Sequence, residues 1–243
     1  MTKPLATTLE DGKAIVRAAE RSGRKLMVAH ERRFRSRVKA LKALLASGEL
    51  GDLIMVQANQ ISDKRAQFAR SPWYASPAAG RSAVVGTGIH EIDLLRFLVD
   101  RPLLGVSAVG NRIGAMTFPA DKTTATVLRF EDGVIGQTAV SYECHWPKDR
   151  PADHFLLVAS RGVVSGGRVA RDGRDGWEEL PVDVSEIAAG CAGAVHAFLD
   201  AVVNGTEVPV QPRDAYATLA ACVAADVSAA TGRTVVPDAA DFA

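Results

Sequence analysis

The chain has 243 residues, of which 47% are hydrophobic and 23% charged, and 29 lysines and arginines against 28 acidic residues give a net charge of +1. This composition is typical of a globular protein of one or two domains and excludes disordered, collagen-like and coiled-coil chains. The balanced charge provides no overall positive field for nucleic acid or an anionic membrane. The sequence contains no run of 18 apolar residues, the length needed to span a bilayer.

Compartment is indicated by the N-terminus and the cysteines. The N-terminus has no apolar segment of the kind that secretory signals carry. The three cysteines, Cys144, Cys191 and Cys222, are widely spaced and form no C-x-x-C pair. This usage argues against a disulfide framework and a zinc ribbon. We therefore expect a cytoplasmic protein without membrane or nucleic-acid partners.

The first 61 residues alternate helical and strand patterns. Thr8 begins a capping-box pattern before apolar residues at helical spacing, and Gly23 ends this helix. The apolar run 25–30 has the length of a strand. A second helix is expected over 34–48, and a strand with partial alternation over 53–61.

The remainder of the chain groups its strands together. Residues 62–82 are polar and irregular, so we interpret them as a long surface loop, a kind of segment that is often functional or mobile. A helix is expected over 86–99. Strands are expected at 104–109, 123–130, 134–143, 154–159, 163–169 and 177–180, and closing helices at 192–203 and 212–230. This grouping predicts an α+β fold with a mostly antiparallel sheet.

A nucleotide-binding signature is missing. A dinucleotide-binding domain needs several strand–helix units and normally a G-x-G-x-x-G turn after its first strand. That motif occurs nowhere here, and Gly86-Thr87-Gly88 has only its first two glycines. The sequence therefore predicts a substrate-type domain that carries a short α/β segment at its start.

His90 and Asp93 form the most suggestive pair for chemistry, because residues three apart share one face of a helix. A neutral imidazole beside a carboxylate can act as a general acid or base near neutral pH. The same spacing also occurs in surface pairs and helix caps. A metal site that adds Glu91 is disfavoured, because Glu91 points away from the other two, and we expect no metal.

Cations and aromatic residues supply further candidates. Lys3 could donate a proton or anchor a charge if partly buried, or be solvated at a free terminus. Arg32 or Arg33 could bind a polar or anionic substrate at the carboxyl end of a strand, or lie on a solvated helix face. Trp73 and Tyr74 could form a wall against a sugar ring or anchor the loop.

Six segments, in this order, resemble the Gfo/Idh/MocA family of NAD(P)-dependent oxidoreductases. They are Thr2–Ala6 for E-K-P-x-A, Arg33-Phe34 for R-F, Gly48–Gly51 for G-x-L-G, Gly88–Asp93 for G-x-H-x-x-D, Phe130–Gly133 for F-x-D-G and Ser228–Arg233 for S-x-x-T-G-R. No single segment is specific, but the six together cover essentially the whole chain.

The resemblance implies hydride transfer between NAD or NADP and a hydroxyl of a sugar, polyol or inositol-like substrate. It also assigns residues to roles. We expect catalysis by Lys3 and His90, substrate binding by Arg33, Trp73 and Asp93, and cofactor contact by Lys3 and Pro4, which a cis bond would join.

The family architecture implies a domain division. Residues 1–30 would be the C-terminal remnant of a Rossmann domain, and residues 31–243 the substrate and oligomerisation domain. The latter would contain a large open sheet with helices on one face and its other face covered in a homodimer or homotetramer. Such a chain, lacking most of the nucleotide-binding domain, is expected to be inactive alone and to show no affinity for NAD(P)H.

Two departures from the family pattern favour an alternative. The family often has an aspartate four residues before the histidine, where this sequence has Gly86, and its run of three glycines is Ala79–Ser82 here. Gly86 removes a carboxylate that would help to orient His90 or the substrate. The alternative is a non-catalytic substrate-binding or oligomerisation module derived from the family.

Overall fold

A computed structural model describes residues 1–76, 79–145, 155–182 and 190–238. The helices in this part are α1 Leu9–Ser22, α2 Ser36–Ala46, α3 Arg65–Arg70, α4 Ile89–Val99, α5 Cys191–Val203 and α6 Pro212–Thr231. The strands are β1 Leu53–Ala58, β2 Gln60–Ile61, β3 Leu103–Asn111, β4 Thr123–Phe130, β5 Ile135–Ser141, β6 Phe155–Ala159, β7 Gly162–Ser165, β8 Arg168–Arg171 and β9 Glu178–Glu179.

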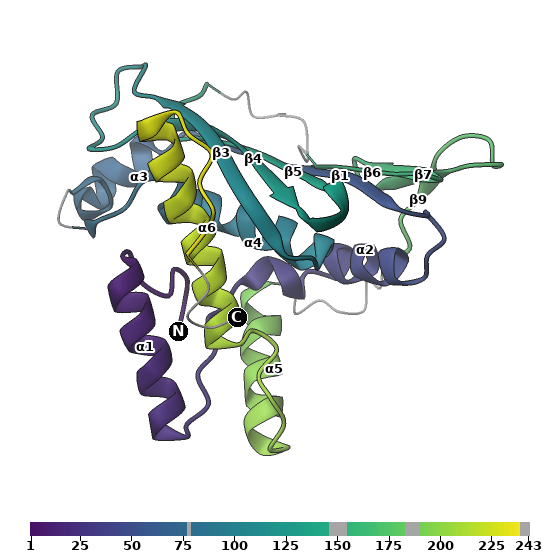
Figure 1. Ribbon diagram of the computed structural model, residues 1–243, viewed down its shortest axis with the longest axis horizontal. Coiled ribbons are helices and arrows are strands. Elements are labelled where there is room, and N and C mark those ends of the chain that lie inside the picture. The colour runs from purple at the N-terminus through teal and green to yellow at the C-terminus, as the bar shows by residue number, and fades with distance from the viewer. Residues whose placement is uncertain (77–78, 146–154, 183–189, 239–243) are drawn as a thin grey trace.

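The nine described strands form one sheet in the order β3-β4-β5-β1-β6-β7-β8-β9, and β2 pairs with β5. Strands β1 and β2 run parallel to β5, whereas the other pairs are antiparallel. Helices α2, α4 and α6 lie along one face of the sheet, and α1 and α5 extend away from it (Figure 1). The predicted α+β fold with a mostly antiparallel open sheet is confirmed.

Strand β4 shows how the sheet separates a buried face from an open one. Leu128 and Phe130 are fully buried in the main core, while Val127, which precedes Leu128, is 46% exposed. Successive side chains of a strand point to opposite faces, so this alternation places one face against the helices. On β5, Ile135 is likewise 42% exposed on a strand whose neighbouring Gly136 is buried.

Helix α4 lies at the centre of the core. The expected apolar stripe of Ile89, Ile92, Leu95 and Leu98 is buried. A π-helical turn over Val84–Gly88 leads into the helix. A Cβ at Gly88 would lie 2.6 Å from a methyl of Val140 on β5, so glycine permits this close approach.

The N-terminal segment packs against the last helix. The hydroxyl of Thr8 accepts a hydrogen bond from the backbone of Asp11 at 3.1 Å, and Gly23 adopts a left-handed φ of 62°, which confirms the predicted start and end of α1. Apolar residues of this segment form a second core with α5 and α6. That core includes Leu5, Val16, Met27, Val28, Ala194, Val210 and Tyr216.

The strand predicted over 25–30 is wrong. Ala29 makes only an isolated parallel bridge with Thr2, and its N–H donates to the carbonyl of Met1 at 2.8 Å. A strand requires hydrogen-bonded neighbouring strands, and within the described residues the bridge to Thr2 is the only β-type pairing of this run.

Three further boundaries are corrected. The loop expected over 62–82 contains α3 and a 3-10 helix over Pro72–Ala75. The strand expected over 163–169 is split by Gly166-Gly167, whose φ values of 58° and 82° form a hairpin turn. The strand expected over 53–61 is interrupted at Asn59, whose side chain accepts from the N–H of Ala139. His154, the expected start of another strand, lies outside the described residues.

Substitutions on the two faces of β4 are expected to change the free energy of unfolding by different amounts. Leu128→Ala removes a fully buried side chain and should lower the free energy of unfolding by about 2–5 kcal/mol. Val127→Ala, on the open face of the same strand, should cost less than about 1 kcal/mol. Urea unfolding of both variants checks this, and similar losses at the two positions would contradict the assignment of faces.

Candidate active site

A pocket of about 350 Å³ lies where the N-terminal segment meets α3, α4 and the residue after β5. Three residues predicted for the site, Lys3, Trp73 and His90, line this pocket. The remaining lining residues are Thr2, Lys64, Gln67, Phe68, Tyr74, Arg81, Gly86, Thr87 and Tyr142. A concave pocket of this size with converging polar groups is typical of a small-molecule site.

Lys3 is held by the turn that precedes α4. Its Nζ donates to the carbonyl of Gly86 at 2.6 Å, and its peptide bond to Pro4 is cis. Burial, together with the nearby charge of Arg81, lowers the pKa of Lys3 to about 8. Lys3 is therefore an ammonium ion at neutral pH that loses its proton in mildly alkaline solution.

His90 faces a carboxylate that the sequence did not point to. Its Nδ1 lies 3.0 Å from Oε2 of Glu31, in the 3-10 helix η1 (Glu31–Phe34). Burial lowers the pKa of His90 to about 4, against the opposing effect of Glu31. Burial would raise the pKa of Glu31, but interactions with His90 and the charge of Arg32 lower it to about 2.

These protonation states define what His90 can do. At neutral pH, Glu31 is a carboxylate and His90 a neutral imidazole. A carboxylate beside Nδ1 favours the tautomer with its proton on that nitrogen. The second ring nitrogen, Nε2, then remains as a proton acceptor.

Gly86 is required by its surroundings. A Cβ at this position would lie only 2.6 Å from the hydroxyl oxygen of Tyr142, which itself lies 3.0 Å from Oγ1 of Thr87. Position 86 therefore provides no carboxylate to His90. The carboxylate comes from Glu31, on a different element.

Arg33 and Asp93 lie in the interior and do not line the pocket. Nε and Nη2 of Arg33 donate to the two oxygens of Asp93 at 2.8 and 2.6 Å. Nη1 of Arg33 lies 2.6 Å from Asp214 on α6, and the hydroxyl of Thr218 donates to Asp93. The pair connects η1, α4 and α6. Arg33 and Asp93 therefore lie in an interior ion-pair network, away from the pocket where substrate contacts were predicted for them.

A second buried ion pair lies behind the pocket. The guanidinium of Arg32 binds the carboxylate of Glu91, which is fully buried, and also donates to Gln60 at 2.6 Å. Burial raises the pKa of Glu91 to about 7, although Arg32 opposes the shift. His90, Glu91 and Asp93 thus contact three different partners.

Aromatic rings and an arginine form one wall of the pocket. Trp73 and Tyr74 stack with their ring centroids 4.0 Å apart. The guanidinium carbon of Arg81 lies 5.3 Å from the Trp73 ring and 5.7 Å from the Tyr74 ring. Trp73 is 54% exposed, so it forms the rim of the pocket and remains accessible to a ligand.

Sequence reasoning missed several pocket residues, among them Lys64, Arg81, Thr87 and Tyr142. The polarity of residues 62–82 predicted a functional segment, and it contains the first two. A second signal pointed to Arg81, because it lies within Ala79–Ser82, the segment that replaces the family's run of three glycines. Glu31 carried no comparable signal, because its partner His90 lies on another element.

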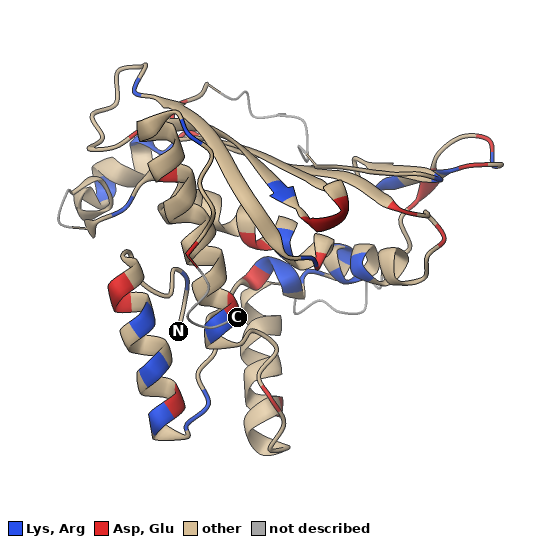
Figure 2. Cartoon of the chain, viewed as in Figure 1, with Lys and Arg blue, Asp and Glu red and all other residues tan. Residues whose placement is uncertain are grey.

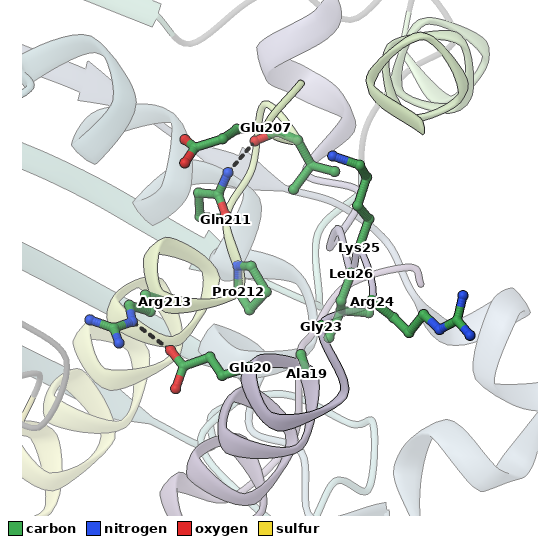
Figure 3. A pocket seen from close by; sticks show the side chains of 11 residues that line it. Ala19, Glu20, Gly23, Arg24, Lys25, Leu26, Glu207, Gln211, Pro212 and Arg213 are labelled. Carbon is green, nitrogen blue, oxygen red and sulfur yellow. Dashed lines mark hydrogen bonds and ion pairs between the residues drawn. The ribbon is translucent and has the colours of Figure 1, made fainter. Parts of the chain in front are cut away.

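A larger cavity, about 460 Å³, lies between the end of α1 and the start of α6 (Figure 3). Several of its polar side chains have partners within the protein. Arg213 pairs with Glu20 at 2.6 Å, Gln211 donates to the carbonyl of Val208 at 2.8 Å, and Lys25 donates to the carbonyl of Thr206. It contains none of the predicted site residues, so we place the candidate site at the Lys3–His90 pocket.

The described residues contain neither a cluster suited to a metal ion nor a helix suited to a membrane. Among these residues, no three His, Cys, Asp or Glu side chains gather in a way that could hold a metal ion. None of the described helices has the length and apolar character needed to cross a membrane.

The buried Arg33–Asp93 pair predicts a large stability loss. Asp93→Ala leaves the guanidinium of Arg33 with one of its two carboxylates missing and should lower the free energy of unfolding by about 3–5 kcal/mol. The control is Glu20→Ala, which removes an exposed pair with Arg213 and should cost less than about 1 kcal/mol. Chemical denaturation measures both, and equal losses would show that the buried pair is not a structural link.

Comparison with known proteins identifies related sequences. The chain is 28% identical to inositol 2-dehydrogenase of Serratia proteamaculans over 93% of this chain and 66% of that protein. It is also 28% identical to D-apiose dehydrogenase of Paraburkholderia graminis over 96% of this chain and 64% of that protein. The chain thus spans about two thirds of the length of these curated relatives.

Solved structures share the fold. An oxidoreductase from Agrobacterium radiobacter, in complex with NAD+, L-tartaric acid and magnesium, has a TM-score of 0.82 at 24% identity, covering 98% of this chain and 72% of that one. Levoglucosan dehydrogenase in complex with NADH has a TM-score of 0.84 at 23% identity, covering 97% and 72%. The sequence pattern of the family described as the GFO/IDH/MocA C-terminal domain matches residues 38–165, slightly more than half of the chain. The chain therefore belongs to the GFO/IDH/MocA family.

Proposed function

We propose that this chain is the substrate-binding part of an NAD(P)-dependent oxidoreductase that transfers hydride to or from a carbon of a sugar, polyol or inositol-like substrate. The observation that carries the proposal is the meeting of Lys3 and His90 in one pocket, with Glu31 behind the histidine. The activities named for the curated relatives, an inositol and an apiose dehydrogenase, support the substrate class.

The residues present fit only the reacting end of the cofactor. When bound, NAD(P) supplies the acceptor or donor of the hydride. Lys3 and His90 line one pocket and could border a nicotinamide ring beside the substrate, with Pro4 joined to Lys3 by the cis bond. The sequence contains no G-x-G-x-x-G turn, so we assign no contact with the cofactor phosphates to the described residues.

His90 and Lys3 divide the proton chemistry between them. In the oxidising direction, Nε2 of His90 accepts the proton of the substrate hydroxyl, while Glu31 holds the ring through Nδ1. The Lys3 ammonium stabilises the negative charge that develops on the substrate oxygen. In the reducing direction, the protonated His90 returns the proton to that oxygen.

The open face of the sheet supports self-association. Val127 and Ile135 are partly exposed on this face, and a run of apolar side chains on a sheet is commonly covered by another chain. We propose that a second copy of the chain covers it in a homodimer or homotetramer.

Removal of either reacting side chain tests the proposed chemistry. His90→Gln and Lys3→Met should each lower kcat for sugar or polyol oxidation by about 10²–10⁴-fold, the range expected for a lost acid–base or charge-stabilising group. The assay follows NAD(P)H absorbance with a panel of sugars and polyols, using protein purified from its source cells beside the 243-residue chain. The control is His196→Gln, which changes an exposed histidine on α5.

Two results would contradict the proposal. Full activity in His90→Gln would remove the histidine from the reaction. Sugar binding without hydride transfer, in both preparations and with either cofactor, would favour the non-catalytic binding module.

The pKa values predict the pH dependence of the oxidation. Below pH about 4, His90 is protonated and cannot accept a proton, so kcat/KM should fall as the pH decreases through that value. Above pH about 8, Lys3 loses the charge that stabilises the substrate oxygen, so kcat/KM should fall again as the pH rises. A pH–rate profile checks this plateau, and a rate that increases through pH 8 would instead make Lys3 the base.

A further inference from the structure

The pocket is positively charged in a way that a neutral sugar does not require. Lys3, Lys64 and Arg81 line it, and none of its described lining residues is an aspartate or glutamate. On α1, by contrast, basic and acidic residues are interspersed along the helix (Figure 2). The chain as a whole carries only +1, so the lining of this pocket is more positive than the chain average.

Lys64 and Arg81 also lack carboxylate partners. Within the described residues, Nζ of Lys64 makes no hydrogen bond or ion pair, although its backbone N–H is anchored to the carbonyl of Tyr142 at 2.9 Å. Arg81 contacts the rings of Trp73 and Tyr74 and, in the same part of the chain, no acidic side chain. By contrast, Arg33 in the interior contacts two carboxylates.

The nearby acidic residues, Glu31 and Glu91, offset this charge only in part. Glu31 faces His90, and Glu91 is paired with Arg32, so neither lines the pocket. The pKa of Lys3 lies below its usual value because of burial and the charges of Arg81 and Lys64, although Glu31 and Glu91 oppose this shift, so both cations repel the Lys3 ammonium. Partly buried cations without partners are costly, and an anion that binds among them removes that cost.

Arg81 is also positioned to recognise an anion by shape. Its guanidinium lies over two aromatic rings, which restrict the long side chain without using its N–H donors. A guanidinium held in this way can donate two parallel hydrogen bonds to a carboxylate or a phosphate. Lys64, which directly precedes α3, adds a second positive charge to the pocket.

We propose that the pocket binds a sugar or polyol carrying an anionic group, a carboxylate or a phosphate, which Lys64 and Arg81 bind while the reacting hydroxyl faces Lys3 and His90. The placement of the reacting hydroxyl rests on the proposed function. The anion site depends only on the charges of the pocket, so it can be tested without the cofactor.

Matched ligands test the charge preference directly. Isothermal titration of the chain with aldoses, the corresponding uronates and the corresponding 6-phosphates, in the gluco, galacto and manno series, separates charge from stereochemistry. In at least one series, the uronate or the phosphate should bind about tenfold or more tightly than the neutral sugar, since hydrogen bonds to charged groups are strong enough for this ratio. The anionic ligand that binds with the higher affinity identifies the group as carboxylate or phosphate.

Variants then assign the preference to residues. Lys64→Gln and Arg81→Gln should each reduce it severalfold, and 0.5 M salt should reduce it in the unmodified chain. Arg70→Gln, which removes an exposed arginine at the end of α3 and outside the pocket, should leave it unchanged. Circular dichroism confirms that each variant is folded, as expected because neither Lys64 nor Arg81 forms an ion pair in the described structure.

A second measurement is independent of the ligand. Loss of the Arg81 charge should raise the pKa of Lys3 above about 8, which NMR titration of the lysine Nζ resonance detects. The proposal is overturned if no series prefers its anionic member, if the preference persists in both variants, or if the pKa of Lys3 is unchanged in Arg81→Gln. Failed hydride transfer with a retained anion preference would overturn only the proposed function.

Discussion

The arrangement of the candidate site depends on the buried guanidinium of Arg33. This one group binds Asp93 on α4 and Asp214 on α6, while Arg33 itself belongs to η1. A buried charge that loses its partner is strongly destabilising, so the three elements have few arrangements that satisfy all the charges. The bidentate contact with Asp93 also restricts orientation, because a guanidinium and a carboxylate must lie nearly in one plane to make two hydrogen bonds. Arg33 therefore fixes η1 against α4.

That fixed junction determines how His90 is held. Glu31 and Arg33 are two residues apart on η1, and His90 and Asp93 are three apart on α4, so the interior ion pair and the Glu31–His90 contact join the same two elements. The carboxylate beside the histidine thus comes from a neighbouring element instead of from the helix of the histidine. Residue 86 therefore does not need to supply a carboxylate to His90, and the carbonyl of Gly86 accepts a hydrogen bond from Lys3.

Sequence alone predicted the features that depend on local chemistry. The cap at Thr8, the end of α1 at Gly23 and the strand over 123–130 each involve neighbouring residues, and these features formed as expected. The strand at 25–30 depended on partners that a local pattern cannot provide. The hairpin at Gly166-Gly167 was missed because the apolar residues on either side could continue one strand. The link between Glu31 and His90 and the place of Lys64 in the pocket depend on how distant segments meet, which no spacing within one element reveals.

The unpaired cations of the pocket connect binding to proton chemistry. Burial and the charge of Arg81 hold the pKa of Lys3 near 8, so the ammonium that would stabilise the substrate oxygen is close to losing its proton. An anionic substrate reverses the electrostatic part of this effect, because a negative charge beside Lys64 and Arg81 cancels the repulsion that Lys3 experiences. Such a substrate would thereby raise the pKa of Lys3 and keep it charged when the hydroxyl is in place. The charge of the ligand would then contribute to the reaction as well as to recognition, and the cost of leaving these cations unpaired in the free protein has a functional reason.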